Sequence, residues 1–290
     1  MNSQQRQQGL DEIGIAPYLV FRETFDVGEL PIHCEVYPAE DPDQPVVLFI
    51  PGIGTYSELY AGFLHRLSGC GYNVVGIDPR GHGYSGGPRG LYSINQVVND
   101  IQLVIDALRR RYRGPLILFG SSFGARLALA VAESAAAIDL LVCHTLFLNE
   151  RPPDMLHRLG WNWVQFNSMI FPWMPVDFRQ FIDVKSLLGD TPLADFAEND
   201  ERMVWRYPLT TLGSVYGASS QVLQKPIGVP ALVVVGEHDQ IISAAYLRGL
   251  VDHSASPFDL QIIPEAGHML PFFNIEETLQ SVDAWVRAQL

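Results

Sequence analysis

A Gly-x-Ser-x-Gly motif at residues 120–124 constrains the fold of this chain more than any other feature. The apolar run 116–119 before it is typical of a buried strand, and the run 123–133 after it has a helical pattern. At the tip of a sharp strand-to-helix turn the backbone is strained, and side chains two residues before and after the tip would collide. Glycine removes this collision, so the spacing predicts Ser122, and not Ser121, at the tip above the end of a sheet. An ordinary serine cap on a helix is the alternative that the motif alone leaves open.

A serine at such a turn needs a base to take its proton and an acid to orient that base. The apolar run 231–235 leads into a turn that contains Asp239. The run 260–263 is predicted as a last strand, and the loop after it carries His268 before a C-terminal helix. The chain order serine, acid, histidine is the one expected when the nucleophile follows a strand in this way. We therefore predict Ser122 as nucleophile, Asp239 as acid and His268 as base.

Both partners of the serine have competitors in the sequence. Asp239 could instead cap a turn, and Glu237 is a second carboxylate two residues away, but the position of Asp239 after the strand favours it. His268 is one of eight histidines. None of the other seven follows a terminal strand in a Gly-His loop, so His268 remains the predicted base.

Acyl transfer through a serine also requires two backbone N–H groups that face the charge developing on the carbonyl oxygen. One donor is predicted at Phe123, because it directly follows the nucleophile. The other is predicted at Ile53, because the strand-like run 46–50 leads directly into the loop 51–54. A simple Pro-Gly turn would explain the glycines of that loop equally well.

Strand-like and helix-like runs alternate along the chain, which predicts an α/β fold with a mainly parallel sheet and helices on both faces. The alternation stops between residues 147 and 226. We therefore predict a core domain of residues 1–146 and 227–290 with a helical lid, residues 147–226, inserted in it. An opening hairpin is expected from strands at 18–24 and 32–37, with further strands at 73–77 and 140–143 and helices near 57–68, 94–111, 244–251 and 275–288.

The predicted lid contains a dense apolar cluster: Trp161, Trp163, Phe166, Met169, Ile170, Phe171, Trp173 and Met174. One interpretation is a small core that packs on the main domain. The other is a wall for an acyl chain or a patch that transiently touches lipid, because aromatic side chains suit apolar pockets and membrane interfaces alike. The two interpretations are compatible, since different faces of one helix can serve each.

Composition argues against several kinds of partner and location. The chain has 290 residues, with 19 basic and 32 acidic side chains and a net charge of −13, which disfavours nucleic acid and anionic membranes as partners. The cysteines Cys34, Cys70 and Cys143 are widely spaced and are expected to be buried thiols without a disulfide or a metal. Residues 1–8 are polar and no run approaches about 20 apolar residues, so we expect neither a secretory signal nor a transmembrane helix, and a cytoplasmic location.

Several motifs together resemble the α/β-hydrolase superfamily: residues 51–57, 78–85 and 89–90, the turn at 120–124, Gly236-x-x-Asp239, and Gly267-His268. Within it, the chain is most similar to the monoacylglycerol lipase and lysophospholipase group of serine hydrolases. The resemblance implies a serine esterase that acts on uncharged acyl esters, has Ser122, Asp239 and His268 as its triad and Ile53 and Phe123 as oxyanion donors, and needs no metal or organic cofactor. One departure is Pro51-Gly52 where many members carry His-Gly, which removes the contribution of that histidine to the loop shape.

Other activities remain open at this stage. The same triad could act on a thioester, an amide or a carbon–carbon bond, or the fold could bind a ligand without turnover. Epoxide hydrolases and dehalogenases resemble this fold but carry an aspartate at the turn where this chain has Ser122. The oligomeric state and the physiological substrate are not predicted by the sequence.

Overall fold

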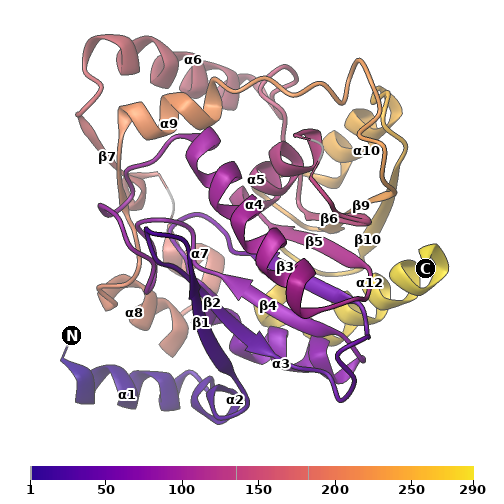
Figure 1. The fold of residues 1–290 in the computed structure, drawn as a ribbon. Helices are drawn as coiled ribbons and strands as arrows, with labels where there is room; N and C mark the ends of the chain where they lie inside the picture. The colour runs from indigo at the N-terminus through magenta and orange to yellow at the C-terminus, as the bar shows by residue number, and fades with distance from the viewer. Residues whose placement is uncertain (1, 135, 182) are drawn as a thin grey trace.

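A central sheet of eight strands organises the protein, whose computed structural model describes residues 2–134, 136–181 and 183–290 (Figure 1). The strand order is β1-β2-β4-β3-β5-β6-β9-β10. β2 pairs in an antiparallel manner with β1 and β4, and the other pairs are parallel. The strands are β1 (Glu23–Val27), β2 (Ile32–Tyr37), β3 (Val46–Ile50), β4 (Asn73–Ile77), β5 (Leu116–Ser121), β6 (Leu140–His144), β9 (Ala231–Gly236) and β10 (Phe258–Ile263). This arrangement confirms the predicted fold class.

Helices cover both faces of the sheet. Strand β3 is buried along its whole length, as expected when a parallel strand packs on both sides. Val46, Leu48 and Ile50 belong to a core shared with α4 (Ile94–Arg111), α5 (Phe123–Glu133) and α10 (Ala244–Asp252). Val47 and Phe49 belong to a second core shared with α3 (Ala61–Gly69) and α12 (Ile275–Gln289). In Figure 1, α4 crosses in front of the sheet and α3 and α12 lie on its other side.

The start of the fold differs from the prediction. Instead of a strand at 18–24, the chain forms the short helix α2 (Ala16–Leu19), and β1 begins only at Glu23. Pro17 stands in the first turn of α2, where its fixed φ and missing N–H suit a helix. The apolar residues that suggested the strand, Val20 and Phe21, are exposed. The opening hairpin itself is present, because β1 pairs with β2 from Val27 and Ile32 onward.

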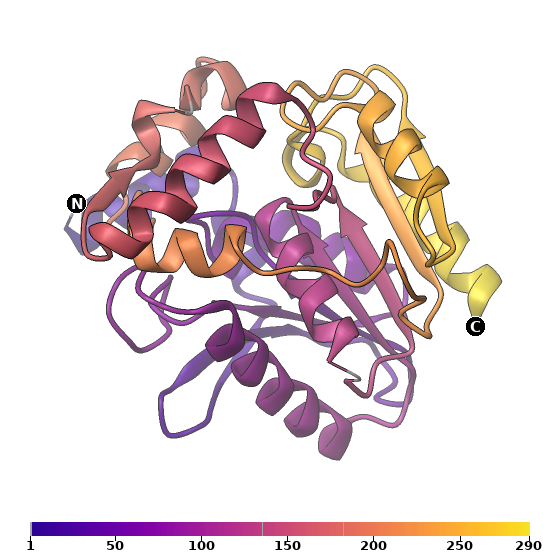
Figure 2. The same ribbon diagram turned by 90° about the horizontal axis from the view of Figure 1, so that it is seen from above.

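The middle segment, residues 147–226, connects β6 to β9 and lies over the end of the sheet at which β5 meets α5. Figures 1 and 2 show two of its helices, α6 and α9, packed side by side. The Val204 N–H donates to the Gly54 carbonyl at 2.9 Å, which ties the segment to the loop after β3. Its elements are α6 (Met155–Ile170), β7 (Pro175–Asp177), the 3₁₀ turn Phe178–Gln180, α7 (Val184–Leu188), α8 (Pro192–Asn199), β8 (Arg206–Pro208) and α9 (Leu209–Tyr216).

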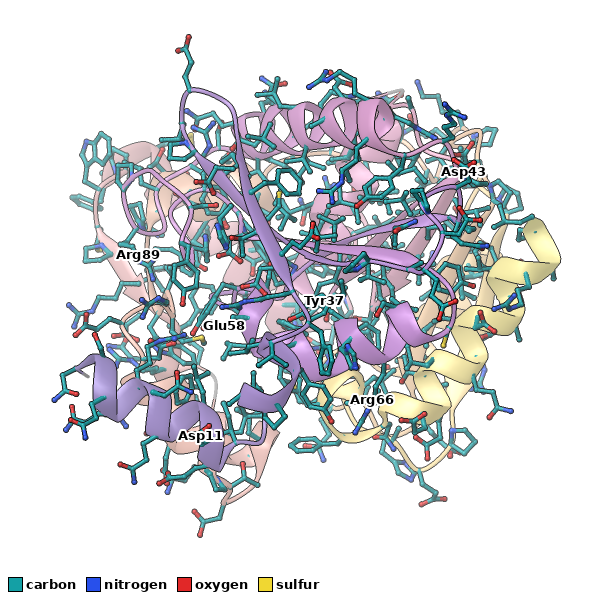
Figure 3. The ribbon with its side chains drawn as sticks, turned by 60° about the horizontal axis from the view of Figure 1, so that its bottom comes forward. Asp11, Tyr37, Asp43, Glu58, Arg66 and Arg89 are labelled. Carbon is teal, nitrogen blue, oxygen red and sulfur yellow. The ribbon has the colours of Figure 1, made fainter. Side chains whose placement is uncertain are left out.

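An N-terminal helix, α1 (Ser3–Glu12), was not expected from the polar sequence at this end. It begins with a capping box in which the Asn2 and Gln5 side chains each bond the backbone N–H of the other residue. The buried guanidinium of Arg6 donates to Glu58 in the 3₁₀ turn Ser57–Tyr60, and its Nε lies 3.4 Å from Asp200 in the middle segment. Figure 3 shows Glu58 between α1 and the strands of the sheet. Arg6 therefore links three parts of the chain.

Replacing Arg6 with methionine should lower the free energy of unfolding by about 2 kcal/mol, because it removes one charged partner of the buried Glu58 and Asp200, which keep their bonds to Arg22 and Tyr56. The matched control is Arg111→Ala, which breaks the exposed ion pair with Glu23 and should change the stability by no more than about 0.5 kcal/mol. Urea unfolding of both variants measures the difference. Equal losses in the two variants would show that the bonds of Arg6 to Glu58 and Asp200 contribute no more to stability than a surface ion pair.

None of the helices in the described part of the chain is both long and apolar enough to span a membrane.

Candidate active site

Ser122 stands at the turn between β5 and α5, as the motif predicts. Its backbone has φ 52° and ψ −118°, a left-handed conformation that few non-glycine residues adopt. A Cβ atom on Gly120 would collide with the Gly124 carbonyl oxygen, and a Cβ on Gly124 would collide with the Ile50 carbonyl oxygen. The two glycines of the motif are therefore required by the close approach of neighbouring backbone.

Three of the residues singled out in the sequence meet at this turn. The Nε2 atom of His268 lies 3.0 Å from the Ser122 Oγ, and its Nδ1 atom lies 2.7 Å from the Asp239 Oδ2. A proton on Nδ1 is donated to the carboxylate, which leaves Nε2 free to accept the serine proton. Asp239 and His268 are separated by 29 residues and Ser122 and His268 by 146, so only the sheet brings them together.

Hydrogen bonds from three residues surround the Asp239 carboxylate. Burial alone would raise its pKa, but the hydrogen bond from His268 and those from the backbone N–H groups of Ile241 and Ile242 outweigh burial, and the net pKa is lowered. These N–H groups lie 2.8 and 2.9 Å from the Asp239 Oδ1. The competing carboxylate, Glu237, is exposed and accepts from the backbone N–H of Glu265 instead.

The two residues predicted as oxyanion donors flank Ser122. Phe123 is the first residue of α5, where N–H groups have no partner within the helix. Ile53 lies in the loop after β3 and lines the same cavity as Ser122. Within the described residues, neither N–H group donates a hydrogen bond to another protein group. Both groups are therefore available to an oxygen bound next to the serine.

A cavity of about 200 Å³ opens beside Ser122 and His268. Its wall comes from the core and from the middle segment, and most of its lining side chains are apolar. They include Ile53, Phe123, Phe147, Trp161, Phe178, Trp205, Ile242, Met269 and Phe272. Apolar clefts with a few polar groups at one end are typical of sites for small organic molecules.

His144 is a buried neighbour of the site that the sequence analysis treated only as one of the other histidines. Its carbonyl accepts the Ser122 N–H, its Nδ1 lies 3.2 Å from the Ser121 Oγ, and its ring centroid lies 5.5 Å from that of His268. Burial, reinforced by the nearby His268, lowers the pKa of His144 to about 3. It is therefore neutral near pH 7. Its position at the end of β6, paired with Ser121, is the signal that could have identified it.

Two groups of side chains in the described part of the chain have a spacing that could hold a metal ion. One combines His144 with Asp239 and His268. In this group the His268 Nδ1 and the Asp239 Oδ2 already share a hydrogen bond. The other, Glu237, His238 and Glu265, is fully exposed, and exposed acidic groups commonly lie together without an ion. The expectation that no metal takes part stays a prediction.

A mainly parallel eight-stranded sheet with a serine at the sharp turn after β5 defines the class, a hydrolase with the α/β-hydrolase fold. The chain belongs to the serine aminopeptidase S33 family, whose sequence profile matches residues 41–273. It is an enzyme, as the relatives of this family also indicate.

Known relatives include several kinds of hydrolase. The chain is 25% identical to a monoacylglycerol lipase of Mycolicibacterium smegmatis over 275 residues, which cover 91% of this chain and 95% of that protein. It is 24% identical to epoxide hydrolase 3 of Xenopus tropicalis over 259 residues, or 79% of this chain and 68% of that protein. The crystal structure of a monoacylglycerol lipase of Paleococcus ferrophilus superposes with a TM-score of 0.73 at 22% identity and covers 89% of this chain and 99% of that one.

Proposed function

We propose that this hydrolase cleaves uncharged acyl esters by acyl transfer through Ser122, with His268 as base and Asp239 as the acid that orients it. The observation that carries the proposal is the unbroken chain of contacts, 3.0 Å from Ser122 to His268 and 2.7 Å from His268 to Asp239. Ser122 and His268 both line an apolar cavity. The match to monoacylglycerol lipases supports the choice of an ester.

The proposed reaction has two halves. His268 Nε2 takes the Ser122 proton while Oγ attacks the ester carbonyl carbon, and the N–H groups of Ile53 and Phe123 stabilise the resulting oxyanion. Collapse of this intermediate breaks the ester bond, and the leaving alcohol receives the proton from His268. Water then attacks the acyl-enzyme with His268 as base again, which releases the carboxylic acid and restores Ser122. Asp239 stabilises the imidazolium in both halves.

The cavity supports an uncharged substrate with an apolar acyl group. Among the described residues that line it, none is Lys, Arg, Asp or Glu. A charged group would lose its hydration there without gaining a partner. The net charge of −13 on the whole chain adds a general repulsion of anionic substrates.

The middle segment, residues 147–226, is the proposed lid domain, with residues 1–146 and 227–290 as the core. Of its eight clustered apolar residues, only Trp161 is buried, where it stacks on Tyr216 at 5.5 Å and lines the cavity. The other seven are exposed, including Phe166, Met169 and Trp173. This observation disfavours a small lid core and supports a patch that transiently touches a lipid surface.

Two tryptophans two residues apart separate these roles in one experiment. Trp161→Ala should lower kcat/KM for long-chain esters about tenfold relative to short-chain esters, because a cavity wall is lost. Trp163→Ala, on the 47% exposed side chain, should leave soluble esters unchanged and weaken association with zwitterionic vesicles. A series of 4-nitrophenyl esters and monoacylglycerols of rising chain length, together with vesicle sedimentation, measures both effects. A short-chain optimum in the wild type would make this a general carboxylesterase, whereas no turnover of any ester would contradict the proposal.

Amide hydrolysis is the second candidate, because the family description names aminopeptidases. The same three residues suit both bonds, since each reaction passes through a tetrahedral oxyanion. Amide and thioester counterparts of the best ester, assayed side by side, decide between them. A higher kcat/KM for the amide would transfer the proposal to that bond.

A further inference from the structure

Three hydrogen bonds close a ring in the loop after β3. The Gly52 N–H donates to the Tyr60 Oη at 3.2 Å, and the Thr55 Oγ1 donates to the Gly52 carbonyl at 2.8 Å. Thr55 Oγ1 and Tyr60 Oη lie 3.0 Å apart. Because the single proton of the threonine hydroxyl goes to the Gly52 carbonyl, the tyrosine hydroxyl is the donor in this third bond. Each donor and acceptor in the ring is used without conflict.

This ring controls the direction of a neighbouring N–H group. The Gly52 carbonyl and the Ile53 N–H belong to one planar trans peptide, so they point in opposite directions. Thr55 holds that carbonyl twice, through its Oγ1 and through its backbone N–H at 3.2 Å. Fixing the carbonyl on one side of the peptide fixes the Ile53 N–H on the other.

The loop lies directly against the serine turn. A Cβ atom on Gly52 would stand 3.6 Å from the Ser122 Cβ and 3.2 Å from the Tyr60 Oη, both close or normal contacts. Tyr60 is 3% exposed and packs against Phe49 and Phe272, so its hydroxyl has a fixed position. The ring is thus anchored in the core and borders the reacting oxygen.

We propose that Thr55 and Tyr60 are positioning residues that aim the Ile53 N–H at the oxyanion. This inference rests on the proposed function, because an oxyanion forms only if Ser122 attacks a carbonyl. A donor that meets its partner only in the transition state changes kcat and leaves substrate binding unchanged. Thr55 and Tyr60 also line the cavity, but their proposed effect on the reaction passes through Ile53 and not through contact with the substrate.

Thr55→Val keeps the shape of the side chain and removes its hydroxyl. It should lower kcat about 10- to 100-fold, below the full loss of one oxyanion donor, with KM within about threefold of the wild type. The affinity for an alkyl boronic acid, which forms a tetrahedral adduct with the serine, should fall by the same factor as kcat/KM. Thr55→Ser restores the hydroxyl and should recover most of the activity. Tyr60→Phe should lower kcat in the same way, and the double variant should lose less than the product of the single losses, because both act in one ring.

Wild-type kcat in Thr55→Val, or an equal loss in Thr55→Ser, would overturn the inference. So would a change in KM alone, since that would make Thr55 a substrate contact. Thermal unfolding of each variant shows whether the fold is intact, and Tyr60→Phe provides the test if Thr55→Val is unstable. The Ser122→Ala variant separates the two proposals: an active Ser122→Ala removes the proposed function, whereas an inactive one beside a fully active Thr55→Val removes only this inference.

Discussion

Ser122→Ala should lower kcat for ester hydrolysis about 10⁶-fold and leave the fold unchanged. The hydroxyl is the only group at the turn after β5 that lies within hydrogen-bond distance, 3.0 Å, of the His268 Nε2 in the described residues. Alanine adopts the φ of 52° no more easily than serine, so the backbone strain stays the same. Without the hydroxyl, only binding and the oxyanion donors can assist water. Initial rates with a 4-nitrophenyl ester and the melting temperature measure both parts of the prediction.

Ser121→Ala is the matched control, because Ser121 has the same side chain and is the last residue of β5, directly before Ser122. Its hydroxyl lies 3.2 Å from the His144 Nδ1 and bonds the Tyr60 side chain, but it does not bond His268. Its removal should therefore cost less than tenfold in kcat. Comparable losses in the two variants would mean that general damage to the turn explains both. Full activity of Ser122→Ala would remove the nucleophile assignment outright.

Asp239→Asn should give the second largest loss, about 10⁴-fold in kcat. The carboxylate accepts the Nδ1–H of His268 at 2.7 Å and so selects the tautomer whose Nε2 can accept a proton. An asparagine amide can donate to Nδ1 instead, which places the imidazole proton on Nε2 and blocks proton transfer from Ser122. Substrate binding should be little affected, because Asp239 is buried behind the imidazole.

The exposed Glu237 offers the control for Asp239. Glu237→Gln should stay within about twofold of the wild type, since this exposed carboxylate accepts a hydrogen bond from the backbone N–H of Glu265 and none from His268 in the described residues. A larger loss in Glu237→Gln than in Asp239→Asn would exchange the two assignments.

Because the pKa of Asp239 is lowered in the fold, its contribution to stability is present at neutral pH and disappears as the pH falls from 3.8 through the folded pKa. The difference in unfolding free energy between wild type and Asp239→Asn should shrink in that range.

The elements that the sequence predicts well are those with strong local signals. The helix expected at 94–111 has the same bounds in the structure, because Ser93 and Gln96 form a capping box and apolar residues recur on one face. The buried strands at 46–50 and 73–77 also agree, since continuous apolar runs are what a parallel sheet requires. Residues in such runs need no distant partner to be recognised.

The missed features depend on contacts between distant residues. Helix α1 is polar, and its anchor is one arginine whose partners, Glu58 and Asp200, stand 52 and 194 positions later. The loop after β3 has Pro51 where many α/β-hydrolases carry a histidine. Side-chain hydrogen bonds of Thr55 and Tyr60 hold this loop, and sequence spacing does not reveal them. The clustered aromatic residues of α6 were recognised, but which of them face the cavity depends on how the helix packs on α9.

The most direct test of the central claim is the reaction of the 290-residue protein with a fluorophosphonate probe, followed by mass spectrometry of its peptides. An activated serine reacts with such a probe, whereas an ordinary serine hydroxyl does not. We expect one adduct per chain, located on Ser122, and no adduct in Ser122→Ala or after denaturation. An adduct on another residue, or none on the folded wild type, would contradict the assignment of Ser122 as an activated nucleophile.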